Sequence, residues 1–188
     1  MGNTDFDTEV AKGILEYMED NGEVNAPEIC TFQKTRTRIT AYDYNDEAES
    51  LDLFYLIKSD TVLGKVNNNK VQQGLNYLMS FYREAMNGTL LRTVTIDNTD
   101  EIAEVAKLVQ STKGSISQLR IYVITNGLTD PACVPSSVES SDDNFIIEYN
   151  VWDMKRVYQQ HNIRSGKEKV EIDFPIEYNT KLQCLKMS

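Results

Sequence analysis

The stretch of sequence that decides the fold lies between residues 38 and 58 and reads Arg38-Ile39-Thr40-Ala41-Tyr42-Asp43-Tyr44-Asn45-Asp46-Glu47-Ala48-Glu49-Ser50-Leu51-Asp52-Leu53-Phe54-Tyr55-Leu56-Ile57-Lys58. Two runs rich in β-branched, aromatic and other apolar residues, 37–44 and 50–58, flank the polar segment 45–49. Such runs favour strands, and a short polar break between them favours a turn. The stretch therefore predicts a β-hairpin with an acidic tip.

Helical and β-type patterns alternate around this hairpin. Apolar residues recur at helical spacing, and we expect helices over residues 5–20 and 65–86, from Thr99 or Asp100 to Lys113-Gly114, and over 152–160. Besides the hairpin, β-type runs cover residues 90–96, 119–125, 145–149, 169–174 and 182–185. Residues between the first helix and the hairpin form a linker with Pro27. Helices interleaved with strands predict an α/β fold, a single-domain sandwich over residues 1–188 with a mixed central β-sheet flanked by helices.

The charge of the chain argues against a nucleic-acid partner. Its 188 residues carry 19 Lys and Arg against 29 Asp and Glu, a formal net charge of -10. A domain that neutralises phosphates normally shows a basic face. We therefore expect no nucleic acid as a partner of this domain alone, and we expect the small basic clusters at 34–38 and 164–169 to be solvated loops.

Several other classes of protein are disfavoured by what the sequence lacks. No apolar run approaches the roughly 20 residues that span a bilayer, and no secretory leader opens the chain, so we expect a cytoplasmic protein without a membrane partner. The three cysteines, Cys30, Cys133 and Cys184, are widely spaced and odd in number, which indicates neither a disulfide framework nor a metal knuckle. The sequence has no glycine-rich phosphate loop, GxSxG, HExxH or CxxC motif.

An acidic-tipped hairpin is the scaffold on which many nucleases carry their metal-binding carboxylates and lysine. A site of the PD-(D/E)xK type needs an acid near the end of one strand and an acid-x-lysine on the next, so that carboxylates hold Mg²⁺ against the scissile phosphate. Here Lys58 is preceded two residues earlier by Leu56, and the first strand offers Thr40 before Asp43. Asp52 shares a face with Lys58 but lies roughly 20 Å from it along an ideal strand. The scaffold is present, and the acids are missing.

Five pieces in one order resemble the N-terminal domain of the AIPR family, the abortive-infection phage-resistance proteins of bacteria. They are the hairpin at 39–58, the strand at 120–127, the Trp-Asp-x-x-Arg-x-Tyr segment within 149–158, and the tail pieces 169–174 and 182–185. The resemblance covers about residues 5–187 and implies a restriction-endonuclease-like fold and a role in phage defence. It also implies an N-terminal fragment, because family members are usually much longer.

Some relatives carry an Ile-Asp-Gly element followed by a Gln-x-Lys strand. The corresponding residues here are Ile39-Thr40-Ala41 and, on the preferred alignment, Tyr55-Leu56-Ile57, while a shift of one residue brings in Lys58. The leading interpretation is therefore a nuclease-like domain with a degenerate site, which acts as an assembly or sensing module. Its expected partner is the C-terminal region of the parent protein or a second copy, and no cofactor is expected.

Two alternatives remain open. In the first, the domain is an active Mg²⁺-dependent nuclease whose candidate catalytic residues are Glu9, Asp43, Asp46 and Lys58, with Asp43 and Asp46 as the metal ligands. Mg²⁺ would be the cofactor only in that case. In the second, the domain is purely structural and packs on the rest of the parent protein.

Two further segments receive structural interpretations. We expect Trp152 to pack at a strand exit, Asp153 to cap the helix after it, and Arg156 to be its ion-pair partner. We expect Asn126-Gly127 to form a turn.

Overall fold

The computed structural model describes residues 4–61, 63–97, 100–135, 138–139 and 146–164. Contacts divide the chain into two units, residues 1–157 and residues 158–188. The sheet and the helices that cover it belong to the first unit, and the described part of the second is the end of helix α5 (Met154–Arg164). The expected strands at 169–174 and 182–185 lie outside the described residues.

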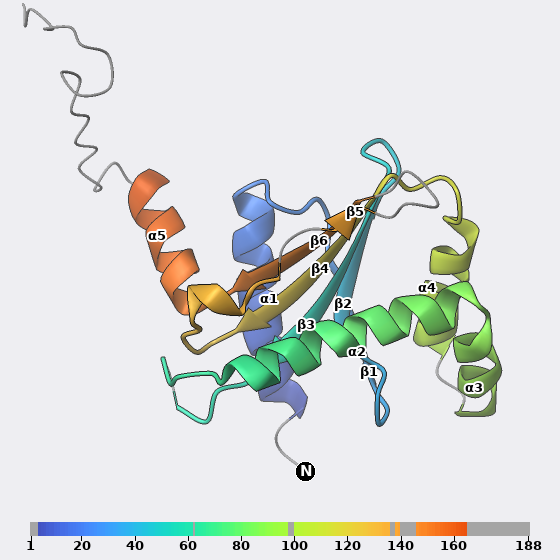
Figure 1. Cartoon of the computed structure of the whole chain (residues 1–188), viewed down its shortest axis with the longest axis horizontal. Coiled ribbons are helices and arrows are strands. Elements are labelled where there is room, and N and C mark those ends of the chain that lie inside the picture. The colour runs from blue at the N-terminus through green and yellow to red at the C-terminus, as the bar shows by residue number, and fades with distance from the viewer. Residues whose placement is uncertain (1–3, 62, 98–99, 136–137, 140–145, 165–188) are drawn as a thin grey trace, which may run out of the picture. The chain divides into compact units, whose positions relative to one another are not determined.

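The first unit is built on one mixed sheet, which bears out the expected α/β class (Figure 1). Strands β1, β2 and β3 are antiparallel neighbours, β3, β4 and β6 are parallel, and the short β5 is antiparallel to β6. The sheet order is β1-β2-β3-β4-β6-β5. The strands are β1 (Glu28–Gln33), β2 (Arg38–Asn45), β3 (Ser50–Ile57), β4 (Gln118–Thr125), β5 (Val138–Glu139) and β6 (Ile146–Trp152).

Helices cover both faces of this sheet. Helix α1 (Thr4–Asp20) packs on one face, where its apolar side chains form a core with Phe54 and Ile124. Helices α2 (Asn68–Met86), α3 (Thr89–Asp97) and α4 (Asp100–Ser111) belong to the core of the other face, with Leu53 and Val123. Because successive side chains of a strand point to opposite faces, a strand covered on both sides is apolar throughout. This explains the nearly unbroken apolar runs in β3 and β4.

The predicted hairpin is confirmed as β2 and β3. Their pairing runs from Asn45 opposite Ser50 to Ala41 opposite Phe54. In the turn, the Asn45 side-chain oxygen accepts the backbone N–H of Ala48 at 2.9 Å. The predicted helices at 5–20 and 65–86 and the strand at 119–125 are confirmed as well, as α1, α2 and β4.

The prediction of a strand at 90–96 is wrong, since this segment is helix α3. Gly88, with φ at +74°, turns the chain after α2, and the Asn87 side chain accepts the Thr89 N–H at 2.9 Å and so caps α3. Leu90 is then fully buried and Leu91 packs on the same core. The cap and this burial outweigh a local β propensity that amounts to a few tenths of a kcal/mol per residue.

Two other boundaries differ from the prediction. The expected linker with Pro27 contains strand β1, an edge strand that buries Cys30 and Phe32. Proline is tolerated just before such a strand because it removes no ladder hydrogen bond there. The helix expected from residue 152 begins at Met154, since Trp152 is the last residue of β6.

Candidate functional site

A small polar pocket, which we call the β3 pocket, lies where β3 ends. It encloses about 140 Å³. Helix α1, strands β1 and β2, and the end of β3 all contribute to its lining, which consists of Asp7, Thr8, Thr31, Gln33, Thr40, Leu56 and Lys58. In α/β folds, sites form at the carboxyl ends of parallel strands, and β3 is parallel to β4. The β3 pocket is therefore the first place to look for function.

Strand β3 determines which of its side chains enter the β3 pocket. Leu56 and Lys58 both line it, whereas Ile57 between them is buried in the core on the α2 face. Leu56-Ile57-Lys58 thus presents one apolar and one cationic side chain to the β3 pocket, with a buried isoleucine between them.

Strand β2 contributes Thr40 to the β3 pocket. The regular β2–β3 pairing stops at Ala41 opposite Phe54. Just beyond it, the Thr40 hydroxyl oxygen accepts the Leu56 backbone N–H at 3.0 Å. The Thr40 side chain thus completes the pairing of the strands.

Lys58 forms an ion pair inside the β3 pocket. Its Nζ lies 2.8 Å from Oδ1 of Asp7 in the first turns of α1, and the two side chains are 30% and 39% exposed. At that exposure such a pair is worth less than about 1 kcal/mol. Its main effect is electrostatic, because the aspartate balances the lysine charge locally.

The other three sequence candidates do not line the β3 pocket. Glu9 is exposed on α1, and Asp46 lies in the exposed hairpin turn, where its Oδ1 accepts the Tyr44 hydroxyl at 2.8 Å. Asp43 is buried, and its Oδ2 accepts the backbone N–H groups of Asn25 at 2.6 Å and Ala26 at 3.2 Å. The structure therefore brings only Lys58, of the four candidates, to the β3 pocket.

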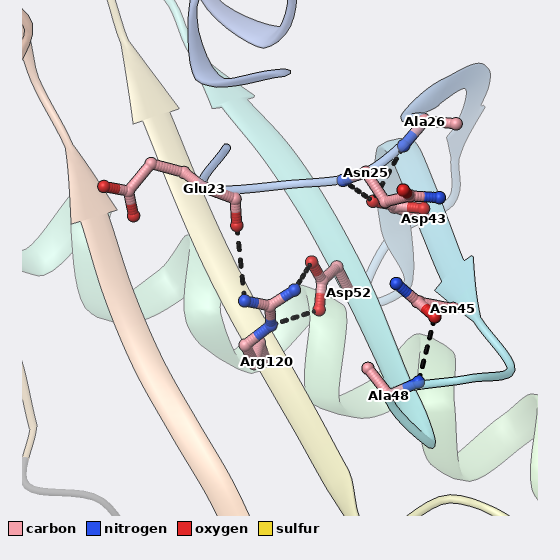
Figure 2. A network of polar contacts seen from close by, with 8 residues as sticks. All are labelled: Glu23, Asn25, Ala26, Asp43, Asn45, Ala48, Asp52 and Arg120. Atoms are coloured by element: carbon pink, nitrogen blue, oxygen red, sulfur yellow. Dashed lines mark hydrogen bonds and ion pairs between the residues drawn. The ribbon is translucent and has the colours of Figure 1, made fainter. Parts of the chain in front are cut away.

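Figure 2 shows Asp43 pointing toward the loop between α1 and β1, and shows a second polar group beside it. Asp52 of β3 and Arg120 of β4 face each other in neighbouring register positions and form a bidentate pair with two contacts of 2.6 Å. Arg120 also donates to the carbonyl oxygen of Glu23 at 3.3 Å. Burial raises the pKa of the Asp52 carboxyl to about 7, although Arg120 opposes that shift. This group ties β3 and β4 to the loop that follows α1.

Mg²⁺ does not fit the residues of the β3 pocket. Magnesium requires several oxygen ligands at about 2.0 to 2.1 Å, usually with one or two carboxylates. The β3 pocket offers one carboxylate, Asp7, which already pairs with Lys58, and the apolar Leu56 lies among its lining residues. Over the described ranges of the chain, no group of three or more His, Cys, Asp or Glu side chains is placed to hold a metal ion.

Sequence reasoning missed Asp7, although a signal for it exists. Ala11, Ile14 and Met18 form the stripe of α1 that is buried against the sheet. Asp7 precedes Ala11 by one helical turn and continues that stripe, whereas Glu9 is two residues further on and turned by about 200°. The helical period alone therefore favours Asp7 over Glu9 as the acid that faces the sheet.

The segment after β6 has the expected cap and a different partner for Arg156. Asp153 Oδ1 accepts the Arg156 backbone N–H at 2.9 Å, and its Oδ2 accepts the N–H and hydroxyl of Thr129 at 2.7 and 2.9 Å. The Arg156 guanidinium lies 4.4 Å from the ring centroid of Trp152, which is fully buried. Asp153 therefore caps α5, as predicted, and Arg156 stacks on Trp152.

Asn126-Gly127 does more than form a turn. The Asn126 side-chain oxygen accepts the Ser59 N–H at 2.8 Å, and a Cβ added to Gly127 would lie 2.5 Å from the carbonyl oxygen of Gly64. The segment after β4 is thus packed directly against the loop that follows β3. This contact fixes the backbone next to Lys58.

Fold and site together define an α/β domain with a mixed sheet and a polar, lysine-bearing pocket at the carboxyl end of a parallel strand. The family model described as the abortive infection phage resistance protein N-terminal domain matches residues 11–159. The chain belongs to this family, as its motifs indicated, and phage resistance is the role that the family's description gives. No curated protein and no solved structure matches the chain. Among the described residues, no helix is long and apolar enough to cross a membrane.

Proposed function

We propose that this chain is a restriction-endonuclease-like domain of a bacterial phage-defence protein whose nuclease site is degenerate, and that it acts in assembly or sensing. It acts in the cytoplasm, and its partner is either the rest of a longer parent protein or a second copy of this chain. The family match and the mixed sheet, with the hairpin β2–β3 followed by α2 and parallel β4, support the fold assignment.

One observation carries the proposal. The two positions that a PD-(D/E)xK site fills with acids hold Thr40 and Leu56, while its lysine is present as Lys58, and all three line the β3 pocket. The scaffold therefore keeps its geometry and lacks the carboxylates that would hold a metal against a phosphate.

The contacts around these residues support a role without cleavage. The Thr40 hydroxyl is engaged by the Leu56 backbone, and Lys58 is paired with Asp7. A water molecule at this place would have no metal ion to lower its pKa and no buried carboxylate pair to take its proton. The β3 pocket offers hydrogen bonds and one ion pair, which suit recognition.

A cleavage assay tests the proposal directly. The purified chain is incubated with single- and double-stranded DNA and RNA in Mg²⁺ or Mn²⁺, and we expect no cleavage above an EDTA control. Metal-dependent cleavage that Lys58→Ala abolishes would contradict the proposal and favour the active-nuclease alternative.

A variant designed to bind a metal ion provides a second test of the same geometry. Thr40→Asp combined with Leu56→Glu restores both acids, so this variant should bind Mn²⁺ with a stoichiometry near one in calorimetry, whereas the unmodified chain should not. The control variant, Asn69→Asp with Asn76→Asp, adds the same charge on exposed positions of α2. Equal Mn²⁺ binding by both variants would show that net charge, and not the β3 pocket, attracts the metal.

A further inference from the structure

A second hollow, which we call the cationic cleft, adjoins the β3 pocket. It encloses about 300 Å³ and shares Asp7, Gln33, Leu56 and Lys58 with the β3 pocket. Two further cations, Arg38 and Lys70, line it. In a chain with a net charge of -10, three cations around one cleft are a local reversal of sign.

The cations converge from three separate elements of the fold. Arg38 begins β2, Lys58 directly follows β3, and Lys70 lies in the first turn of α2. Gln73, one turn further along α2, lines the same cleft and adds an amide donor. A ligand in the cationic cleft would therefore meet positive charge from several directions, unlike a ligand on a solvated loop.

Arg38 is held in place by its neighbours. Its Nη1 donates to the Tyr55 hydroxyl and its Nε to the Lys34 carbonyl oxygen, each at 3.3 Å. Its guanidinium carbon lies 4.5 Å from the ring centroid of Tyr77, and the rings of Tyr55 and Tyr77 meet edge to face with centroids 5.5 Å apart. A guanidinium fixed in this way loses little conformational entropy when it binds, and its remaining N–H groups can form bidentate contacts.

The charges of the cationic cleft are not balanced. Asp7 is the one carboxylate among its described lining residues, and Asp7 lies against Lys58. Within the part of the chain that the structure describes, neither Arg38 nor Lys70 has a carboxylate at ion-pair distance. The described lining thus carries an excess of two positive charges, which matches a terminal phosphate of charge about −1.5 to −2 at neutral pH.

We propose that the cationic cleft binds a terminal phosphate group, with Arg38 and Lys70 as its main ligands and Lys58 beside them. The proposal rests on the proposed function, because it names what the sensing pocket would take. The volume suits a small ligand such as a nucleotide, while the acidic remainder of the chain opposes the backbone of a long nucleic acid. The same phosphate chemistry occurs on a mononucleotide and on the 5′-phosphorylated end of a short strand.

Calorimetry in EDTA with the full chain tests this. The probes are inorganic phosphate, AMP, adenosine, and one short oligonucleotide with either a 5′-phosphate or a 5′-hydroxyl. We expect AMP to bind and adenosine not to bind. Binding of the 5′-phosphorylated strand, but not of its 5′-hydroxyl form, would extend the ligand class to strand ends, and binding of AMP alone would restrict it to nucleotides.

Matched variants locate the binding. Arg38→Gln and Lys70→Gln should each weaken AMP binding at least tenfold, whereas Arg92→Gln and Lys107→Gln, which remove charge at exposed positions elsewhere, should change it less than twofold. Lys70 is exposed on α2, so Lys70→Gln should fold even if Arg38→Gln does not. Absence of binding by every phosphate-bearing probe overturns the inference, and so does an equal loss in the control variants.

The two proposals can fail separately. Binding is measured without metal, and cleavage is measured with it. A chain that cleaves nucleic acid refutes the degenerate site whatever AMP does, and a chain that neither cleaves nor binds phosphate refutes only the cationic cleft.

Discussion

Replacing Arg120 by Met should destabilise the domain, and the loss should be larger in alkali than in acid. The change removes the bidentate partner of Asp52, whose side chain is only 1% exposed. Methionine fills part of the space without offering a hydrogen bond, so the carboxyl must either stay charged without a partner or keep a proton. Breaking a buried pair from one side generally costs about 3 to 5 kcal/mol.

The structure allows the pH dependence to be worked out. Asp52 has a pKa of about 7 in the folded chain, raised by burial, against about 3.9 in an unfolded one. A raised folded pKa means that the folded state binds the extra proton, so this group makes stability fall as pH rises from about 4 to about 7. Above pH 7 the unmodified chain should level off, whereas Arg120→Met, in which the pKa rises further, should continue to lose about 1.4 kcal/mol per pH unit.

The expected costs follow from that slope. At pH 5.5 the carboxyl is largely protonated in both folded proteins, so Arg120→Met loses hydrogen bonds worth about 1 to 2 kcal/mol. At pH 8.5, about 1.5 units above the folded pKa, the cost should be larger by about 2 kcal/mol. Urea unfolding at constant ionic strength measures both values, and the fluorescence of Trp152, the single and fully buried tryptophan, reports the transition.

The control is Arg120→Met in a chain whose residue 52 carries no carboxyl. In an Asp52→Asn background, Arg120→Met should cost the same at the two pH values, because nothing at position 52 titrates. A cost of Arg120→Met that is independent of pH, or larger at pH 5.5, in the unmodified background would refute the reasoning, because the loss of Arg120 would then not raise the pKa of the Asp52 carboxyl.

Four further substitutions test the remaining contacts by urea unfolding. Asp43→Ala should lower stability by about 2 kcal/mol, since two backbone N–H groups lose a charged acceptor but can reach water. Gly127→Ala should cost about 2 to 3 kcal/mol, because its Cβ would meet the backbone oxygen of Gly64. As its control, Gly13→Ala lies in the interior of α1, where an added Cβ has no neighbour within 4 Å, and it should stabilise the domain by about 0.5 to 1 kcal/mol. Asp153→Ala should cost about 2 to 3 kcal/mol through the lost cap and the lost contacts to Thr129, and a loss below 0.5 kcal/mol would contradict the capping role.

The sequence predicts the centre of this fold because local and global preferences agree there. Residues 53–57 are apolar on both faces, favour strands, and lie between two helices that cover them. Residues 90–96 favour strands equally well, yet they form α3 because Asn87 caps the segment and Leu90 finds a buried place. A cap of about 1 kcal/mol and a buried leucine outweigh local propensity, and the burial is not visible before the fold is known.

The candidate site, like the fold, is predictable from the sequence where it depends on local pattern and not where it depends on distant partners. The sequence alone places Lys58 at the end of the hairpin with Leu56 two residues before it. It does not show that Asp43 is bound to the backbone of Asn25, because that contact joins residues 18 positions apart. An aspartate near a predicted turn is a metal ligand or a loop anchor depending on such non-local partners.

In the proposed degenerate site, the missing acids and the excess positive charge have one physical explanation. In a metal-dependent site the carboxylates repel a phosphate, and the metal ion between them turns that repulsion into binding. With Thr40 and Leu56 at those positions, neither the repulsion nor the metal is present. The lysine of such a site, together with Arg38 and Lys70, can then attract a phosphate without assistance. Thr40→Asp with Leu56→Glu should therefore weaken AMP binding in EDTA, and added Mn²⁺ should restore it.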